Sequence, residues 1–214
     1  MSTVASEVAR KLLQVKAVKL QPNNPFTWAS GLKSPIYCDN RILLSYPDIR
    51  TSIKVALKNK LLAFPDIDIV AGVATAGIPH GALLADAVEK PFIYIRSKSK
   101  SHGRKNLIEG ELPEGARVLV IEDLISTGMS SMTACDAVTE NGGHVIGVLA
   151  IFTYGFSSAK KVFTDKGIPM DTLSNYNVLL QEAYESNYIT EEEKQILESW
   201  NEDPKLWDQK QQTI

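Results

Sequence analysis

The chain has few cysteines, no long apolar run and almost no net charge. Its 214 residues include two cysteines, Cys38 and Cys135, which are far apart and lack the spacing of metal ligands. We therefore expect reduced thiols, as in a cytoplasmic protein. Uncharged stretches such as IVAGVATAGIPHGALLA are interrupted by Gly, Pro and His, and they are shorter than the ~20 apolar residues of a membrane helix. A formal net charge of −2 argues against a partner such as nucleic acid or a membrane surface.

The beginning of the sequence also lacks the apolar segment of a signal peptide, because Glu7, Arg10 and Lys11 interrupt it. The sequence contains no internal repeat and no low-complexity stretch. A hydrophobic fraction of 44% is ordinary for a globular protein. We expect a cytoplasmic protein in which residues 1–214 form a single domain.

Short continuous apolar runs begin at residue 67 and predict buried strands. The runs are IDIVAGV, FIYIR, RVLVI and HVIGVLAIF, and such runs are typical of strands covered on both faces of a parallel sheet. Helical stretches are expected between them, at about 78–89, 129–141 and 157–166. This alternation predicts an α/β fold with a doubly wound, mostly parallel sheet and helices on both faces.

The segments on either side of this core have a different character. Residues 3–16 repeat apolar positions at helical spacing, and Pro47 opens a second helix. Between them, QPNNPFTWASGLKSPIYCDNR is rich in turn-forming residues and predicts a small hood. Residues 175–200 predict two helices. The expected division is an N-terminal helix and hood at about 1–45, a core sheet at 46–175 and C-terminal helices at 176–214.

An acidic pair precedes a turn of small residues in RVLVIEDLISTGMS. Glu122 and Asp123 are expected at the carboxyl end of the strand RVLVI, where ligands of parallel sheets gather. The turn offers backbone N–H groups, a helix N-terminus and the hydroxyls of Ser126, Thr127 and Ser130, which together form a phosphate cradle. Carboxylates accept hydrogen bonds from sugar hydroxyls. The pattern favours a ribose 5-phosphate, although a strand, an acid and a Ser/Thr cap also occur in α/β proteins without such a ligand.

The full stretch VLVIEDLISTGMS resembles the signature of type I phosphoribosyltransferases. In that family it holds the ribose 5-phosphate of 5-phosphoribosyl 1-diphosphate (PRPP). The resemblance implies the family's fold and PRPP as the donor, but adenine, hypoxanthine and orotate enzymes share this signature. It implies a PRPP site that includes Glu122, Asp123, Leu124, Ile125, Ser126, Thr127, Gly128, Met129 and Ser130.

Further stretches indicate the acceptor. The run YIRSKSKSHGRKNLIEGEL is usually a solvated basic loop, and it lacks the aromatic residues of a nucleic-acid site. However, Arg96, Lys100, His102 and Gly103 resemble the catalytic loop of orotate phosphoribosyltransferases, Arg-x-x-x-Lys-x-His-Gly. The stretch FTWASGLKSPIYCDNR resembles the part that covers orotate in these enzymes, and GVATAGIPHGALLA resembles their diphosphate loop. The similarity spans about residues 20–180.

This resemblance implies the reaction of orotate with PRPP to give orotidine 5′-monophosphate (OMP) and diphosphate, in pyrimidine (UMP) biosynthesis. Arg96, Lys100 and His102 are expected to stabilise the departing diphosphate, while Glu122 and Asp123 hold the ribose hydroxyls. Mg²⁺ is expected to bind through PRPP and water, with no firm direct protein ligand. A homodimer that shares its catalytic loop across the interface is also implied.

Two rival functions remain open. One is another PRPP-dependent base phosphoribosyltransferase, such as a purine enzyme, although the hood stretch and the Lys-x-His-Gly motif argue against it. The other is a PRPP-sensing regulatory protein. That would need a DNA-reading domain, whereas residues 1–16 predict a single helix of mixed charge.

The sequence departs from the family where orotate is bound. Many members have a lysine at the positions of Ala29 and Ala76 and an arginine at that of Tyr154. An anionic ring acid in a covered site needs charge or several hydrogen-bond donors. Ser126 is expected near the orotate, but the source of positive charge is left open.

The remaining cations of the hood are Lys33 and Arg41. We expect both to bind orotate, and the planar guanidinium of Arg41 matches a carboxylate better than an ammonium does. The alternative is that Arg41 pairs with Asp39 or Asp48, while backbone N–H groups around residues 31–34 hold the orotate.

Overall fold

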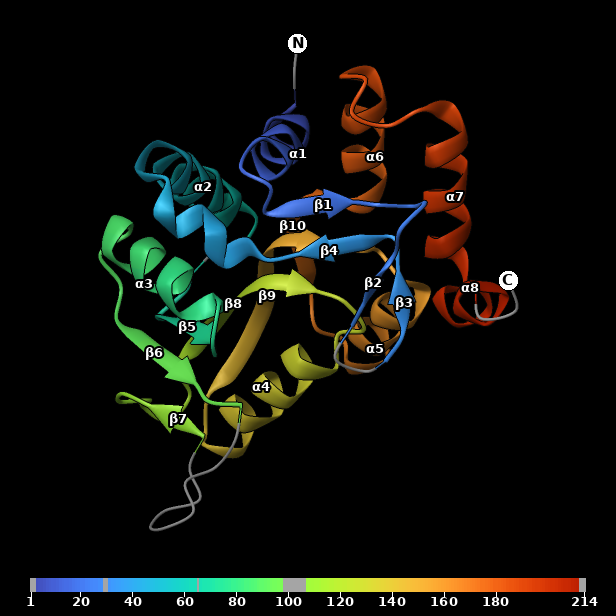
Figure 1. Cartoon of the computed structure of the whole chain (residues 1–214). Coiled ribbons are helices and arrows are strands. Elements are labelled where there is room, and N and C mark those ends of the chain that lie inside the picture. Colours follow the sequence, from blue (N-terminus) through green and yellow to red (C-terminus); the bar gives the residue numbers. More distant parts are fainter. Residues whose placement is uncertain (1–2, 29–30, 65, 98–106, 212–214) are drawn as a thin grey trace.

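The computed structural model describes residues 3–28, 31–64, 66–97 and 107–211. Its centre is a six-stranded sheet (Figure 1). The strands are β5 Ile69–Val73, β6 Phe92–Ile95, β7 Ile108–Glu109, β8 Arg117–Ile125, β9 His144–Thr153 and β10 Met170–Asn175. Their order is β10-β9-β8-β5-β6-β7. Only the pairing of β6 with the edge strand β7 is antiparallel, so the chain winds outward from β5 in both directions.

Helices cover both faces of this sheet. They are α1 Val4–Gln14, α2 Pro47–Lys60, α3 Gly77–Ala87, α4 Met129–Glu140, α5 Ser157–Lys166, α6 Tyr176–Glu185, α7 Glu191–Glu202 and α8 Pro204–Gln211. Side chains of α1, α2, α3 and α6 share one hydrophobic cluster with the sheet, and those of α4 and α5 share another. The predicted doubly wound α/β architecture is confirmed. In the described part of the chain, no helix has the length and apolar character needed to span a bilayer.

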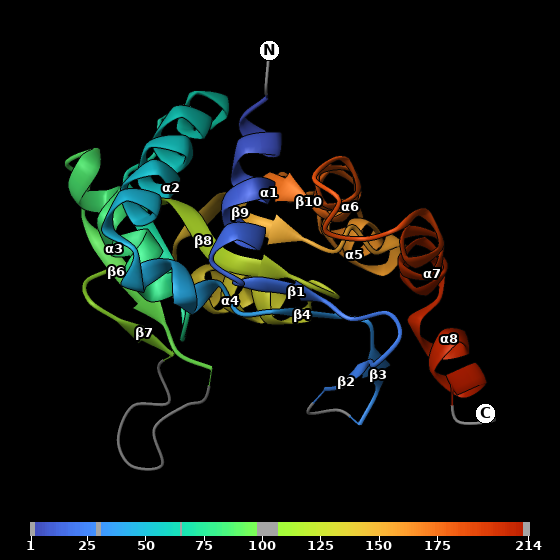
Figure 2. The same ribbon diagram turned by 45° about the horizontal axis from the view of Figure 1, so that its top comes forward.

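The hood, residues 18–38, contains two short antiparallel pairs. Strand β1 (Val18–Leu20) pairs with β4 (Ile36–Cys38), and β2 (Phe26–Thr27) pairs with β3 (Lys33–Ser34). The β2–β3 hairpin projects away from the sheet, with α8 beside it (Figure 2). A 3₁₀ helix, η1 (Asn40–Ser45), connects the hood to α2. The C-terminal helix therefore lies next to the segment predicted to cover the base.

No sequence pattern singled out several of the elements, among them two strands of the sheet and helix α8. Strands β7 and β10 lie at the two edges of the sheet, and β10, with the sequence MDTLSN, has only Leu173 and Ser174 buried. Helix α8 is short and polar, with Trp207 as its buried apolar side chain. None of these three elements has the apolar pattern from which a core element is predicted.

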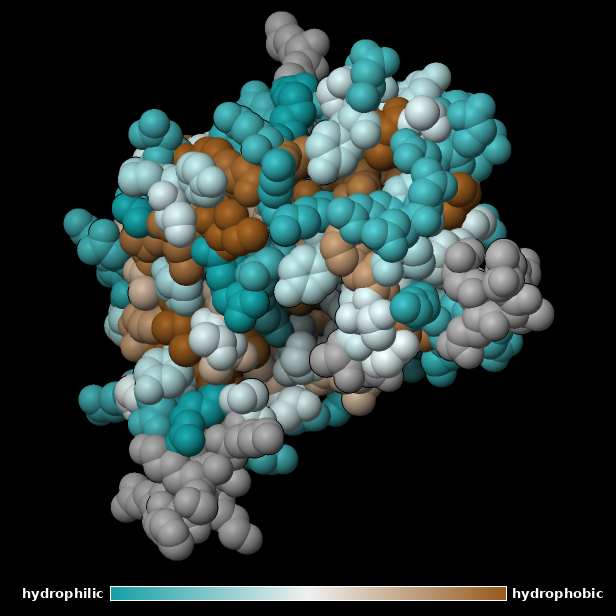
Figure 3. All heavy atoms as spheres, in the orientation of Figure 1, coloured by the Kyte–Doolittle hydropathy of each residue, from teal (hydrophilic) through white to brown (hydrophobic). Residues whose placement is uncertain are grey.

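Hydrophobic side chains are also exposed at the surface. Figure 3 shows brown surface on the side of α2 and α3, next to hydrophilic surface over β1 and β4. Among the exposed apolar side chains are Val55 of α2 and Leu62 of the following 3₁₀ helix, with exposed fractions of 48% and 91%. Contiguous apolar surface often marks a contact site between proteins.

Candidate active site

The acidic pair follows the run RVLVI at the carboxyl end of β8, and the strand continues past it to Ile125. The strand pairs with β5 only as far as Ile121, which lies opposite Gly72. From Glu122, opposite Ala150, its pairing continues with β9 alone. Hydrogen bonds to β9 therefore extend the strand beyond the apolar run. Glu122 and Asp123 lie beyond the last residue pair with β5, at the carboxyl edge of the sheet, where open α/β folds bind ligands.

The two acids point to opposite faces of the sheet, as consecutive strand residues do. Glu122 faces α4, where its Oε1 accepts hydrogen bonds from Ser131 Oγ at 3.0 Å and Ser130 Oγ at 3.4 Å. It is 4% exposed. Burial, with a contribution from the neighbouring Asp123 charge, raises the pKa of Glu122 to about 8. Ser131 was not predicted to take part, because its position inside a helix gives no local signal of this contact.

Asp123 lies on the other face, toward the root of the hood. Burial raises its pKa, while the nearby Arg41 lowers it and Asp39 raises it. Its backbone carbonyl accepts a hydrogen bond of 2.7 Å from the side-chain amide of Asn40, which is fully buried. The opposite orientations mean that the two carboxylates do not form a joint chelate. Among the described residues, no group of three or more His, Cys, Asp or Glu side chains could hold a metal ion.

The turn after β8 has the shape of an anion site. Gly128 has φ +81°, and a Cβ there would come within 3.2 Å of the Phe163 ring, so glycine is required. It is the N-cap residue of α4 and supplies no side-chain cap, which leaves N–H groups of the first helical turn for a ligand. Thr127 is exposed beside it and Ser126 is half-buried.

The other residues expected at this loop differ in exposure. Leu124 is half-buried, Met129 is 60% exposed, and the side chain of Ile125 is buried in the core. Ser130 is exposed and directed to Glu122. Contacts of these residues with PRPP stay predictions.

The predicted catalytic loop begins at Arg96, directly after β6. The Arg96 backbone N–H donates to Leu107 O at 2.8 Å, and its guanidinium pairs with Glu109 at 3.4 Å. Pairing of β6 with β7 thus brings the two ends of the predicted loop together. Lys100, His102 and Gly103 lie outside the described residues.

The hood cations have partners. Arg41 forms a two-pronged ion pair with Asp39, with N–O distances of 2.7 and 2.8 Å, and the Arg41 hydrogen bond lowers the pKa of that carboxyl. This is one of the alternatives left open by the sequence, and contact of Arg41 with orotate stays a prediction. Lys33 Nζ donates to Thr27 Oγ1 at 2.9 Å. Ala29 lies outside the described residues.

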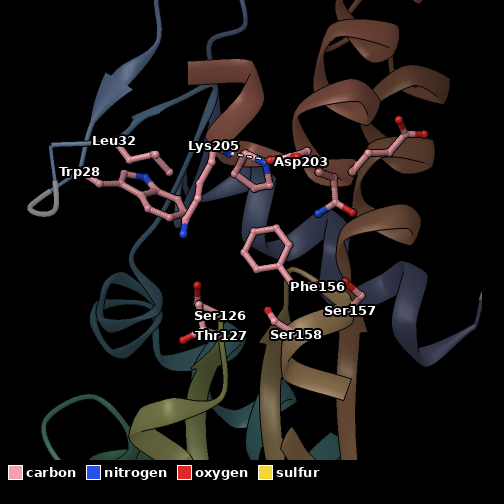
Figure 4. Close-up of a pocket in the computed structure, with 12 residues that line it drawn as sticks. Trp28, Leu32, Ser126, Thr127, Phe156, Ser157, Ser158, Asp203 and Lys205 are labelled. Carbon is pink, nitrogen blue, oxygen red and sulfur yellow. Dashed lines mark hydrogen bonds between the residues drawn. The ribbon is translucent and has the colours of Figure 1, made fainter. Parts of the chain in front are cut away.

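A cavity of about 630 Å³ opens beside the phosphate turn (Figure 4). Trp28 and Leu32 of the hood, Ser126 and Thr127 of the turn, and residues 201–205 line it. Trp28 and Ser126 also line a neighbouring cavity of about 490 Å³ under the hood. The contribution of the C-terminal segment to this cavity was not predicted, because no sequence pattern connects that segment to the hood.

Comparison with known proteins agrees with this geometry. The phosphoribosyl transferase domain family matches residues 42–186. An orotate phosphoribosyltransferase of Bacteroides thetaiotaomicron is 52% identical over 94% of this chain and 95% of its own length. One from Enterococcus faecalis is 50% identical over 97% and 99%. The crystal structure of orotate phosphoribosyltransferase from Aeropyrum pernix superimposes with a TM-score of 0.75 and 27% identity, covering 86% of this chain and 99% of that one.

The chain therefore belongs to the phosphoribosyltransferase family and has the type I fold of that family. Within that family, it falls in the group of the orotate phosphoribosyltransferases. A Mycobacterium tuberculosis member of this group has been solved in complex with PRPP, and it superimposes with a TM-score of 0.64 and 25% identity over 82% of this chain and 98% of that one.

Proposed function

We propose that the protein is an orotate phosphoribosyltransferase, a pentosyltransferase that transfers the ribose 5-phosphate of PRPP to orotate in UMP biosynthesis. One observation carries the proposal. The uncapped N-terminus of α4, the Gly128 turn and the acids of β8 converge at one edge of the sheet. The relatives with this name are about half identical to the chain over nearly its full length.

In the reaction, the bond between the anomeric carbon and diphosphate oxygen breaks, and its electron pair leaves with diphosphate. A ring nitrogen of orotate then bonds to that carbon and gives up its proton to diphosphate or water, which yields OMP. Positive charge develops on the sugar, as in glycoside cleavage. Thr127 and Gly128 hold the 5′-phosphate, Asp123 and Glu122 bind the ribose hydroxyls, and the catalytic-loop cations Arg96, Lys100 and His102 neutralise the leaving group.

The residues present fit Mg²⁺ bound mainly through the substrate. Mg²⁺ prefers oxygen ligands and keeps several waters, and the carboxylates of Glu122 and Asp123 face opposite sides of β8. The ion supplies charge neutralisation for the diphosphate. The protein contributes the cradle that orients the ribose 5-phosphate.

We further propose a cytoplasmic homodimer in which the catalytic loop of one protomer closes over the site of its partner. Exposed apolar side chains such as Val55 and Leu62 supply surface that association could bury. Residues 1–214 then form one functional unit, with the N-terminal segment over the base, the core sheet below, and the C-terminal helices at the side.

The experiment that tests this function measures diphosphate release from PRPP with Mg²⁺ and orotate, adenine or hypoxanthine. We expect diphosphate release when orotate is the acceptor, and none with adenine or hypoxanthine. A preference for a purine would establish the rival enzyme, and PRPP binding without turnover would establish a sensor. In the double variant Glu122→Gln, Asp123→Asn, kcat/KM for PRPP should fall at least about tenfold, because hydrogen bonds to charged groups contribute ~1.5–3 kcal/mol.

A further inference from the structure

The proposed function requires a partner for the ring carboxylate of the substrate, and none has been assigned so far. Orotate and OMP carry a ring carboxylate, and a covered carboxylate needs a positive partner or several donors. Tyr154, at the end of β9, is 3% exposed and stacks against Trp28 with ring centroids 5.7 Å apart. Burial raises its pKa well above the usual range, so Tyr154 supplies no positive charge. The inference that follows rests on the proposed function.

Lys33 and Arg41, the two cations predicted to bind orotate, already have partners. The Arg41 guanidinium uses two of its nitrogens on Asp39, and its side chain is 59% exposed. Lys33 Nζ is bonded to the Thr27 hydroxyl. Neither Arg41 nor Lys33 lines the two cavities that contain Ser126.

A cation from the C-terminal segment does line the larger cavity. Lys205 is the positively charged residue of that lining, across from Ser126 and Thr127. In Figure 4 its side chain extends from α8 toward the phosphate turn, and the ammonium ends on the side of Trp28 and Ser126. Within the described ranges, the Lys205 ammonium has no ion-pair partner.

Hydrogen bonds fix the backbone that carries Lys205. Asp203 Oδ1 accepts the N–H groups of Lys205 at 3.1 Å and Leu206 at 3.0 Å, which caps α8. Asn201, at the end of α7, donates its side-chain amide to Tyr154 O at 2.8 Å. The segment that supplies the cation is thus bonded to the residue at which many family members have an arginine.

We propose that Lys205 pairs with the ring carboxylate of orotate and OMP, and that it sets the preference for a pyrimidine acid over a pyrimidine without the carboxylate. Asp203 does not compete for the ammonium, because its carboxylate caps α8. Glu202 is exposed at the same lining. The negative charge of Glu202 repels an anionic ligand, so replacing this residue provides a matched control.

The test compares OMP with UMP, which differ only by the ring carboxylate. Dissociation constants of both nucleotides are measured by titration calorimetry for the full chain and its variants. In Lys205→Gln the preference for OMP over UMP should fall by up to about fivefold, since a partly exposed ion pair contributes up to about 1 kcal/mol. Lys205→Arg should keep the preference, and Glu202→Gln should keep or increase it.

The orotate KM should rise by a similar factor in Lys205→Gln, while the PRPP KM stays within about twofold. An unchanged OMP-to-UMP preference in Lys205→Gln overturns the proposal. If Arg41→Gln then abolishes the preference, Arg41 binds the carboxylate, and if neither variant does, backbone N–H groups bind it. A wild-type chain that forms no OMP from orotate refutes the proposed function instead, so the two failures are distinguishable.

Discussion

The side-chain amide of Asn40 donates a hydrogen bond to the backbone carbonyl of Asp123 across 2.7 Å. Asn40 is fully buried and begins η1, directly after the hood. The same bond therefore connects the segment proposed to cover the base to the strand that carries the acids. Asn40 is a positioning residue in this geometry, because its amide acts on the backbone of the acid pair.

Replacing Asn40 should disturb ribose binding more than it disturbs folding. In Asn40→Ala the Asp123 carbonyl loses its partner, and a buried group left unpaired costs ~1–3 kcal/mol. We expect kcat/KM for PRPP to fall about tenfold with the circular dichroism spectrum unchanged. Asn59→Ala, at an exposed position of α2, is the control. A folded Asn40→Ala enzyme with wild-type kcat/KM would show that the bond serves stability alone.

The buried Glu122 should make stability depend on pH. Its pKa in the folded protein is about 8, against an ordinary value of 4.5. Between these values the folded state binds a proton that the unfolded state has released. The contribution of Glu122 to the free energy of unfolding is therefore fully present below about pH 4.5 and is lost as pH rises to about 8.

The melting temperature of the ligand-free wild type should consequently decrease between pH 5.5 and 8.5, and the melting temperature of Glu122→Gln should decrease less. A difference on the order of 1 kcal/mol corresponds to roughly 2–4 °C for a chain of this size. Calorimetric scans across this range make the measurement, with Glu140→Gln, an exposed residue of α4, as the control. Parallel curves for wild type and Glu122→Gln would mean that the carboxyl is ionised in the fold.

Local patterns in the sequence predicted the core of this protein well. The runs around Val70 and Leu119 became strands because both faces are buried, and the two helices expected at residues 175–200 formed, the second of them behind a Thr190–Glu193 capping box. Such local patterns could not predict contacts between residues that are far apart in the sequence. Asn40 and Asp123 are 83 positions apart, and no periodicity encodes their bond. The polar helix α8 reaches the site through individual hydrogen bonds, so neither its existence nor its role was predictable.

One of these bonds leads to a prediction for the C-terminal helix. Asp208 of α8 is 9% exposed, and its carboxylate accepts the Lys33 backbone N–H at 2.8 Å. It thereby holds β3 of the hood. Asp208→Ala should raise the orotate KM about fivefold or more and leave the PRPP KM within about twofold, because the hood is the segment proposed to cover the base. The exposed Glu185→Ala is the control, and equal changes in both KM values would indicate general destabilisation instead.

The last prediction concerns the proposed dimer and uses two inactive variants. Lys100→Ala removes a cation of the catalytic loop, and Asp123→Asn removes an acid of β8. If each active site takes its loop from the partner protomer, a mixed dimer contains one site with both groups intact. Random exchange at equal amounts gives half mixed dimers, and should restore roughly a quarter of wild-type activity. Exchange is verified with two affinity tags. A mixture that has demonstrably exchanged and stays inactive would place the loop over the site of its own protomer.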